Sequence, residues 1–466
     1  MSKSSESHGV DAAETWSVVV RDQDQVLRGL EQGECDGILP DEWLDVDNLV
    51  QTALEEGFLD WFADFPDPRR RRSIDKQLFC RVLLCGRLVD TPSVAATGRV
   101  VFHSATLLDK LGFNFRQVRE GGPRTGDHRP FDEEALEDYF ARLTPKDYLS
   151  HQVKVAGQLR ARASLDGDIW LLDCQDTSLP NGHHHAGYHW KTAVLSVCTA
   201  AGPQPLLWNF GPAPDTADLS LGRRLVAAAR RAWGDKPMRW LIVDAGFIDG
   251  PWMRALKRRG TDTIIRIREG MDNYQAAVHR ATQAPCSAWQ AVALPKRRPP
   301  KVRPLRREIL SLTDQPGWLG LDLPISICVV RDTYADKTEY WVLVCTQPEL
   351  SGAAIYALFR QRWGIEECFM ALARYHGLND LYPCRKGLAL ALIHFTLLAQ
   401  TLRYLCLRAR VARGPFPRTK YLVVYWAGYY ALLHASQILE KIFDHWQAWQ
   451  SRREEVLATL RYCEGG

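Results

Sequence analysis

The spacing of hydrophobic positions changes near residue 165 of the chain. Before that point, apolar residues recur at helical spacing in three stretches. These are Lys76 to Leu88, Pro92 to Leu111 and Phe131 to Leu159. The second stretch predicts two helices with a break at Gly98, and the third predicts two more. Residues 1–20 show no such period and are expected to be disordered, so we predict a helical N-terminal region over residues 21–160.

After residue 165 the apolar runs become short, and turn residues separate them. Three runs predict a three-stranded antiparallel meander, namely Ile169 to Cys174, Thr192 to Thr199 and Pro205 to Phe210. Helical and strand patterns then alternate as helix Leu219 to Trp233, strand Arg239 to Asp244, helix Pro251 to Arg259 and strand Thr263 to Ile267. This order predicts an α/β fold.

The segment from Met271 to Val344 has a different composition. It combines a basic, proline-rich stretch with strand-like runs at Ile325 to Val330 and Tyr340 to Val344, which predicts a mostly β insertion subdomain. Prolines block helix formation between Lys296 and Arg307, so we expect an exposed basic loop that can follow phosphates. Its candidate DNA-binding residues are Arg297, Arg298, Arg306 and Arg307.

The longest apolar helix is predicted from Gly387 to Leu407. Its polar residues His394, Gln400 and Arg403 favour a buried bundle helix over a membrane span. Residues 411–466 are expected to form a helical C-terminal region.

Three carboxylates are expected to converge from separate elements. One predicted strand leads into Asp173 and Asp176, and another ends at Asp244. Farther along, Arg362 precedes Glu366 by one helical turn on the same helix face. Three ionised acids close together repel one another unless a cation compensates, and Mg²⁺ or Mn²⁺ can do so. Two such ions about 3.5–4 Å apart assist in-line displacement at a phosphodiester, so the pattern indicates phosphoryl transfer on nucleic acid.

Two of these carboxylates have rivals close by. Asp173 competes with Asp176, and strand alternation favours Asp176 because Asp173 shares a side with Leu171. Glu367 competes with Glu366, but it lies about 100° around the helix and is expected in solvent.

The basic and aromatic residues of the same helix also admit two interpretations. Arg362 either pairs with Glu366 or clamps a phosphate, and we prefer the phosphate because a guanidinium binds its oxygens bidentately. Trp363 is expected in the core.

The run from Leu343 to Glu366 resembles bacterial insertion-sequence transposases of the DDE class, specifically those with a Tyr-Arg-Glu-Lys signature. That signature reads Tyr, two residues, Arg, three residues, Glu, six residues, Lys. Arg362 and Glu366 fit it, and the resemblance extends from about Asp168 to Gly377.

Two signature positions are altered in this chain. The Tyr position falls on Phe359, and the Lys position falls on Ala373, with Arg374 next to it. The family's first Asp usually precedes Thr, which favours Asp176, and its second is followed by Gly-Phe, which matches Asp244.

The resemblance implies a ribonuclease H-like catalytic domain made of residues 165–270 and 345–410, interrupted by the insertion at 271–344. The helical region before it would then either recognise DNA ends through a helix-turn-helix-like module or serve a purely structural role.

The implied activity is that of a DNA transposase. Two Mg²⁺ or Mn²⁺ ions held by Asp176, Asp244 and Glu366 would serve phosphodiester hydrolysis at transposon ends and strand transfer into target DNA. Arg362 and Arg374 would contact the DNA. The resemblance further implies a cut-and-paste route, with a DNA hairpin as one variant, and a homodimer that holds inverted-repeat ends.

Composition adds the cellular setting. The net charge of +4 is only mildly basic, and the 12 cysteines are scattered singly, as expected for reduced core residues. The polar N-terminus lacks the apolar core of a signal peptide, and we expect a cytoplasmic, nucleoid-associated bacterial protein without a membrane partner.

Two other functions remain open. The missing hydroxyl at Phe359 and the missing ammonium at Ala373 motivate a weakened descendant that binds transposon-like ends as a repressor or competitor without cutting them. The histidine cluster His183 to His189 could bind zinc, although a polar β-hairpin loop is the preferred interpretation because cysteine and carboxylate ligands are missing at zinc spacing.

Overall fold

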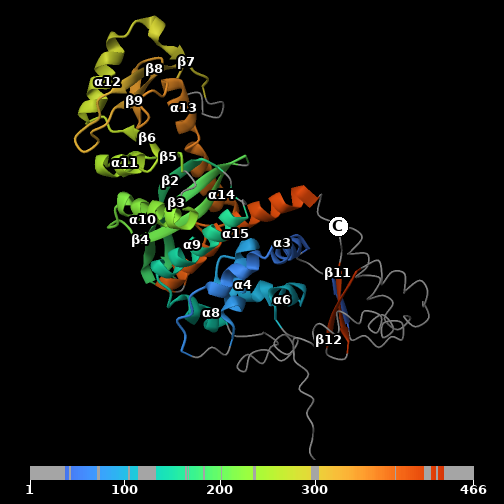
Figure 1. Cartoon of the computed structure of the whole chain (residues 1–466). Helices are drawn as coiled ribbons and strands as arrows, with labels where there is room; N and C mark the ends of the chain where they lie inside the picture. Colours follow the sequence, from blue (N-terminus) through green and yellow to red (C-terminus); the bar gives the residue numbers. More distant parts are fainter. Residues whose placement is uncertain are drawn as a thin grey trace, which may run out of the picture. The chain divides into compact units, whose positions relative to one another are not determined.

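The computed structural model describes residues 37–40, 44–70, 74–102, 105–113, 133–162, 165, 167–181, 184–200, 202–234, 238–294, 304–383, 385–413, 421–426 and 429–434 (Figure 1). They fall into two compact units, each of which is described by itself. The sheet unit comprises the described parts of Thr144–Leu179 and Ala186–Asn379. The helical unit comprises those of Met1–Leu143, Pro180–His185 and Asp380–Gly466.

A mixed β-sheet forms the centre of the sheet unit. Within the described residues it contains nine strands, in the order β4-β3-β2-β5-β6-β10-β9-β8-β7. Their bounds are β2 (Ile169–Asn181), β3 (His184–Thr199), β4 (Gly202–Pro212), β5 (Trp240–Val243), β6 (Asp262–Ile267), β7 (Gln290–Ala291), β8 (Arg306–Gln315), β9 (Ile325–Thr333) and β10 (Thr338–Cys345). The meander β2-β3-β4 and the parallel strands β5 and β6 confirm the predicted order of elements.

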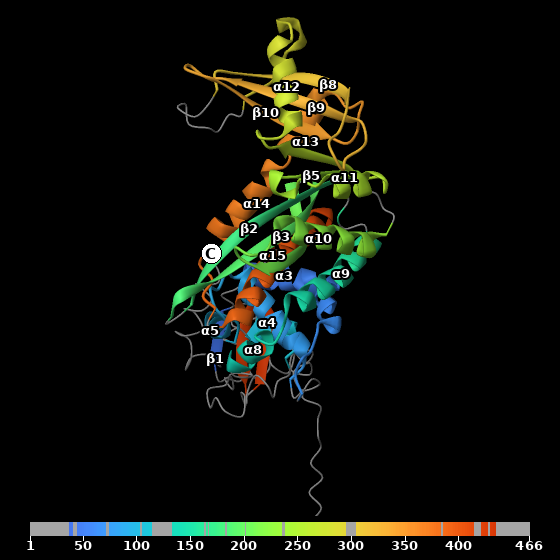
Figure 2. The same cartoon turned by 90° about the vertical axis from the view of Figure 1, so that its left-hand side faces the viewer.

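Helices cover both faces of this sheet (Figure 2). They are α9 (Pro145–Ala161), α10 (Asp218–Trp233), α11 (Gly250–Lys257), α12 (Asp272–Gln283), α13 (Gly352–Arg360) and α14 (Trp363–Tyr375), with the short 3-10 helices η2 (Ala245–Phe247) and η3 (Cys286–Ala288). On one face, Leu171 and Ile242 pack with Ile355 of α13 and Ile365 of α14. On the other face, Leu172 lies so close to Gly222 of α10 that a Cβ added there would be 2.8 Å from it.

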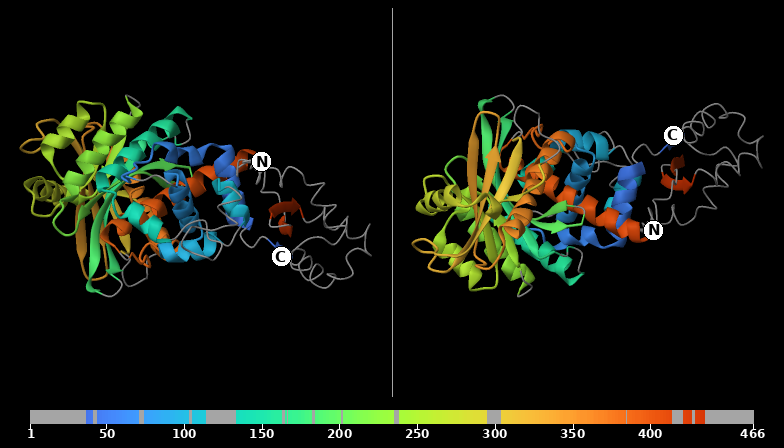
Figure 3. Two further views of the ribbon diagram at one scale, coloured as in Figure 1. Left: turned by 90° about the horizontal axis from the view of Figure 1, so that it is seen from below. Right: turned by 90° about the horizontal axis from the view of Figure 1, so that it is seen from above.

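The edge strand β4 is covered by α9, which also packs beside α10 (Figure 3). The Gln152 side-chain oxygen accepts a hydrogen bond from the backbone N–H of Trp208 at 2.6 Å. This contact satisfies a strand donor that has no neighbouring strand on that side.

The segment 271–344 is rich in strands, as predicted, and also contains α12. Its strands do not form a sheet of their own. β10 pairs antiparallel with β6 through contacts such as Leu343 with Arg266, so the segment extends the same sheet. β6 is therefore an interior strand with a parallel neighbour on one side and an antiparallel neighbour on the other.

The helical unit contains α3 (Leu44–Glu55), η1 (Phe58–Asp64), α4 (Lys76–Leu88), α5 (Val94–Val101), α6 (Ala105–Leu111), α8 (Glu133–Phe140) and α15 (Lys386–Arg413). The predicted break at Gly98 is wrong, because Gly98 lies inside α5. A Cβ there would come within 2.5 Å of Glu133 in α8, so this glycine serves close packing between helices. α9 and α15 fall in different units from those the sequence suggested, since α9 belongs with the sheet and α15 with the other helices.

The C-terminal region contains strands where helix was expected. β11 (Tyr421–Trp426) and β12 (Tyr429–His434) form an antiparallel pair, and β11 also pairs with β1 (Gly37–Pro40). Valine, tyrosine and tryptophan dominate β11, and these residue types favour strands. The prediction of helix is wrong for these residues, while 435–466 and the predicted disordered residues 1–20 lie outside the described part of the chain.

The long helix α15 is a core helix of its unit. Its segment Lys386–Ala409 is long and apolar enough to cross a membrane, but 78% of its most apolar window is buried inside the protein. His394 is fully buried there, in agreement with the predicted bundle helix.

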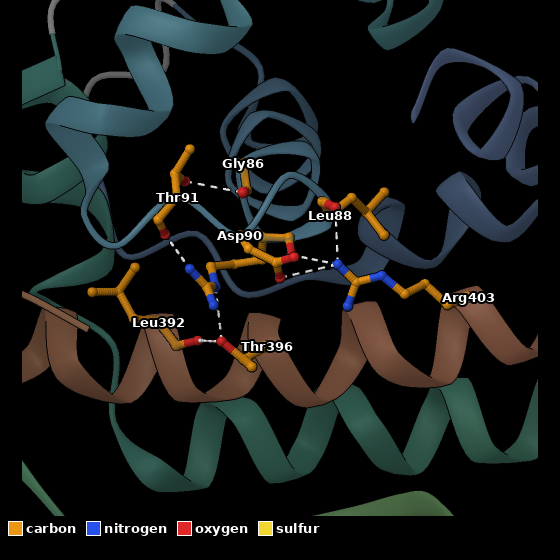
Figure 4. Close-up of polar contacts among 8 residues, drawn as sticks. Gly86, Leu88, Asp90, Thr91, Leu392, Thr396 and Arg403 are labelled. Atoms are coloured by element: carbon orange, nitrogen blue, oxygen red, sulfur yellow. Dashed lines mark hydrogen bonds and ion pairs between the residues drawn. The ribbon is translucent and has the colours of Figure 1, made fainter. Parts of the chain in front are cut away.

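A buried arginine, Arg87, connects α4 to α15, and Figure 4 labels its acceptor residues Thr91 and Thr396. Arg87 is 0% exposed, and its Nε donates to the Thr396 hydroxyl at 2.8 Å while its Nη1 donates to the carbonyl of Thr91. Burial lowers the pKa of Arg87 to about 10, so the group stays charged at neutral pH. Nearby, Arg403 of α15 donates to Asp90 at 3.1 Å and to the carbonyl of Leu88 at 2.9 Å.

We predict that Arg87→Lys lowers the free energy of unfolding by about 1–3 kcal/mol, because an ammonium cannot reach both oxygens from one stem and leaves a buried acceptor unpaired. Arg99→Lys, on the exposed side of α5, is the matched control and should change stability by less than about 0.5 kcal/mol. Urea unfolding followed by circular dichroism measures both, and equal midpoints would contradict the structural role of Arg87.

Candidate active site

Two neighbouring parallel strands in the interior of the sheet bring two aspartates together. β2 and β5 are in register at Leu172 with Val243, so the next residues along each strand are Asp173 and Asp244. The strands run parallel, so Asp173, in the first half of β2, and Asp244, which follows the last residue of β5, lie side by side. Asp244 is also the N-cap residue of η2.

Arg362 joins β2 to helix α14. It lies at the junction between α13 and α14, and its Nη1 donates to Asp173 Oδ2 at 2.9 Å. Its Nη2 forms an ion pair with Oε1 of Glu366, one helical turn further on. The guanidinium carbon lies 5.6 Å from the ring centre of Phe359. The predicted pairing of Arg362 with Glu366 is thus present, and it includes Asp173 as well.

The charges of Asp244 and Glu366 act on the Asp173 carboxyl. The pKa of Asp173 is raised to about 6, mainly by burial, and the charges of Asp244 and Glu366 contribute to the rise. Arg362 and the Cys174 backbone N–H act in the opposite direction. A carboxyl with like charges around it and a single cation beside it is typical of a site built to hold positive charge.

Asp176, the predicted first carboxylate, lies elsewhere. It is exposed, and its charge acts on Lys191, which forms an ion pair with Asp218 of α10 at 2.7 Å. The structure therefore brings Asp173, and not Asp176, beside Arg362. Alternation placed the two aspartates on opposite faces of the strand, and the choice of the catalytic one between them stays a prediction. The face shared with Leu171 is the one that α14 covers, and Asp173 follows Leu171 on that face.

The predicted environments of the other α14 residues are found for some residues and not for others. Glu367 is exposed, as expected, whereas Trp363 is 48% exposed and the prediction that it is a core residue is wrong. Ala373 is half-buried and Arg374 is exposed near the end of the helix.

The donors present suit a hard divalent cation. Asp173, Asp244 and Glu366 offer only carboxylate oxygens, which Mg²⁺ and Mn²⁺ prefer. Within the described part of the chain, no three histidine, cysteine or acidic side chains are already arranged around one point as metal ligands. Asp173 and Glu366 are not arranged as metal ligands because oxygens of both carboxylates are bonded to Arg362.

The histidine cluster is part of a strand where it is described. β3 begins at His184, and His189 Nδ1 is hydrogen-bonded to the Ser178 hydroxyl at 2.9 Å. The expected hairpin loop is therefore shorter than predicted. His183 lies outside the described residues.

The predicted basic loop is only partly a loop. Arg297 and Arg298 lie outside the described residues, but Arg306 and Arg307 belong to strand β8. Arg306 pairs with Glu308 at 2.5 Å. Arg307 makes two parallel bonds to Asp332, at 2.5 and 2.6 Å, and donates to the Tyr356 hydroxyl at 3.2 Å. Arg307 is therefore a neutralised structural residue, and its assignment to an exposed phosphate-binding loop is wrong.

The sequence did not lead us to predict a role for two arginines, Arg266 in β6 and Arg268 just after it. Arg266 is exposed, and its guanidinium lies 5.9 Å from the ring centre of Trp341. Arg268 is exposed and donates to the carbonyl of Ala245, the residue after Asp244, at 3.3 Å. Among the described residues, no carboxylate lies within ion-pair distance of either guanidinium. Their spacing of two residues, at the carboxyl end of the strand beside β5, could have indicated that both face the same side near Asp244.

A family model described as the transposase DDE domain matches residues 166–401, which is more than half of the 466 residues. A search of curated proteins finds no match. The matched segment contains β2, β5 and α14 together with Asp173, Asp244, Arg362 and Glu366. The chain therefore belongs to the transposase DDE domain family, whose members are enzymes that act on DNA.

Proposed function

We propose that this protein is a DNA transposase whose catalytic carboxylates are Asp173, Asp244 and Glu366. The observation that supports the proposal is the bonding of Arg362 to both Asp173 and Glu366, beside an Asp244 whose charge acts on Asp173. The reaction begins with hydrolysis at the transposon end, where water attacks phosphorus and the bond to the 3′-oxygen breaks, leaving a 3′-hydroxyl. That hydroxyl then attacks a target phosphodiester, and a target 3′-oxygen leaves.

Asp173, Asp244 and Glu366 would hold two Mg²⁺ or Mn²⁺ ions, which supply charge stabilisation to the pentavalent phosphorus when bound. The protein itself contributes position and charge. Burial of Asp173 excludes water from one side of the reacting phosphate, and the Arg362 guanidinium is of the right shape to bind two phosphate oxygens.

The membership in the Tyr-Arg-Glu-Lys subclass is part of this proposal. Phe359 stands at the Tyr position and retains its packing role, because its ring lies under Arg362 and 6.2 Å from the ring of Trp341. Only the hydroxyl is lost. The substitution thus preserves the platform that supports Arg362, which favours an active enzyme over the end-binding repressor that Phe359 and Ala373 also suggest.

We further propose a cut-and-paste route, carried out by a homodimer that holds two inverted-repeat ends in the cytoplasm on the nucleoid. Support comes from the family membership and the resemblance of the signature. The presence of terminal inverted repeats and short target duplications around the gene would favour this mobile enzyme over a domesticated binder.

We predict that Asp173→Ala, Asp244→Ala and Glu366→Ala each reduce Mg²⁺-dependent strand cleavage by at least about a thousandfold, since each removes a ligand of the metal ions that stabilise the transition state. DNA binding should stay within a few fold of wild type, because basic residues supply most of that affinity. Cleavage of a labelled duplex carrying the element's own ends measures the first effect, and a gel-shift assay measures the second.

Asp176→Ala is the matched control, since it removes the same charge from the opposite face of the same strand. It should cleave at nearly the wild-type rate. Loss of cleavage in Asp176→Ala with retention in Asp173→Ala would return the first ligand to Asp176, and full activity in all four variants would refute the site.

A second prediction contrasts Arg266 and Arg307, whose guanidinium groups both lie near the ring of Trp341. Arg266 is exposed and free of carboxylate neighbours among the described residues, whereas Arg307 lies 5.3 Å from the same ring and is bonded to Asp332. Arg266→Ala should weaken DNA binding for all sequences and reduce the slope of log affinity against log salt by about 1, because one phosphate contact is lost.

Arg307→Ala is expected to behave in the opposite way. It leaves Asp332, which is 4% exposed, without its cation, so it should lower stability by about 3–5 kcal/mol. The salt slope of the folded fraction should not change. A normal slope in Arg266→Ala would show that this guanidinium does not touch the DNA.

A third prediction concerns the altered Lys position. Ala373 lies seven residues after Glu366, two turns along the same helix face, and the exposed Arg374 is turned about 100° from that face. Because the long Arg374 side chain can reach back, Arg374→Ala should lower end cleavage clearly, while Ala373→Lys should be neutral or raise it. If Arg374→Ala leaves end cleavage unchanged and Ala373→Lys strongly raises it, the natural protein is a weakened enzyme.

A further inference from the structure

Arg362 occupies the place between two of the proposed metal ligands where a cation would be expected. We propose that Arg362 is the resident cation of the DNA-free site: it holds Asp173 and Glu366 until a DNA phosphate draws it away, so that divalent metal binding is coupled to DNA binding. This inference rests on the proposed function, because it assigns a regulatory property to the same carboxylates. In it Arg362 is a positioning residue that determines the order in which partners bind.

The hydrogen bonds of Asp173 show why metal and Arg362 compete. Oδ1 accepts the backbone N–H of Cys174 at 2.8 Å, and Oδ2 accepts Arg362 Nη1 at 2.9 Å. Both oxygens of this carboxylate are therefore already engaged. Glu366 uses Oε1 for the same guanidinium. A divalent cation that took these oxygens would lie next to a positive charge, and the two cations would repel one another.

The guanidinium also has a reason to leave when phosphate is present. Its Nε is buried and has no hydrogen-bond partner in the described structure, which is an unfavourable state for a charged donor. A phosphate can accept from Nε and one Nη together, in the bidentate arrangement that arginine prefers. The ring of Phe359 offers no hydroxyl that could take that place.

Arg362 is situated so that such a movement requires little reorganisation. It is the residue before α14, and its side chain is 17% exposed, whereas the backbone around it is fixed by the helices on either side. A change of side-chain torsions moves the charge from the carboxylates toward solvent and DNA. The carboxylates then lack a cation, and the metal supplies it. By linkage, metal and DNA each raise the affinity of the site for the other.

The test measures Mn²⁺ binding by the full chain with electron paramagnetic resonance, without turnover. In wild type, the apparent Kd for Mn²⁺ should fall about tenfold when a short duplex of mixed sequence is added, with the Mn²⁺ bound by duplex alone subtracted. Arg362→Ala should bind Mn²⁺ about tenfold more tightly than wild type in the absence of DNA, and the duplex should then add little.

Arg360→Ala is the matched control. It removes the same charge from an exposed position on the preceding helix and should behave like wild type. Arg362→Lys keeps a charge but cannot hold both carboxylates, so it should fall between wild type and Arg362→Ala. If Arg362→Ala does not fold, the Mn²⁺ affinity of Arg362→Lys tests the resident-cation role. Asp173→Ala identifies the Mn²⁺ bound at this site.

Equal Mn²⁺ affinities for wild type and both Arg362 variants without DNA would overturn the resident-cation role. If wild type nevertheless cleaves DNA, only this inference fails and the transposase site stands. If none of these proteins, with or without duplex, binds Mn²⁺ that Asp173→Ala removes, the proposed metal site fails together with it.

Discussion

The parallel pairing of β2 with β5 determines where chemistry can occur in the sheet unit. The register that sets Leu172 beside Val243 leaves Asp173 and Asp244 as neighbours, and a slip of one residue would turn one of the two to the opposite face. The hydrophobic residues before them maintain this register, because Leu171 and Ile242 are buried in the same core. The acidic site is thus held by apolar packing directly behind it.

The sequence pattern predicted most helices and strands of the sheet unit, but it did not predict which strand face is covered or which side chains pair. The meander, the alternating helices and strands, and the position of Glu366 followed from periodicity, which depends on local sequence. The choice between Asp173 and Asp176 depended on which face α14 would cover, and α14 lies almost two hundred residues further along the chain. Neither alternation nor a neighbouring threonine carries that information.

Arg307 illustrates the same limit for charge. In the sequence it ends a basic run, and its neutralising partner Asp332 is 25 residues away on the adjacent strand. Antiparallel pairing of β8 with β9 places the two opposite each other, through Arg307 with Asp332 in register. A count of basic residues therefore overestimates the positive charge that is exposed at the surface, whereas Arg266 and Arg268 are both exposed although each stands alone in the sequence.

The covering of the sheet edges limits how copies of this protein can associate. Among the described strands, one edge is β4, where α9 packs and Gln152 takes up a backbone donor, and the other is β7, which has only two residues. A long sheet with open edges would invite a strand from a second copy to add to it. β7 pairs only with Glu308 and Ile309 of the ten-residue β8, so residues 310–315 have no second strand partner among the described residues. A strand added from a second copy would meet the sheet there, with β9, β10 and β6 between it and the β2–β5 pair, and would leave the hydrogen bonds that align Asp173 with Asp244 undisturbed.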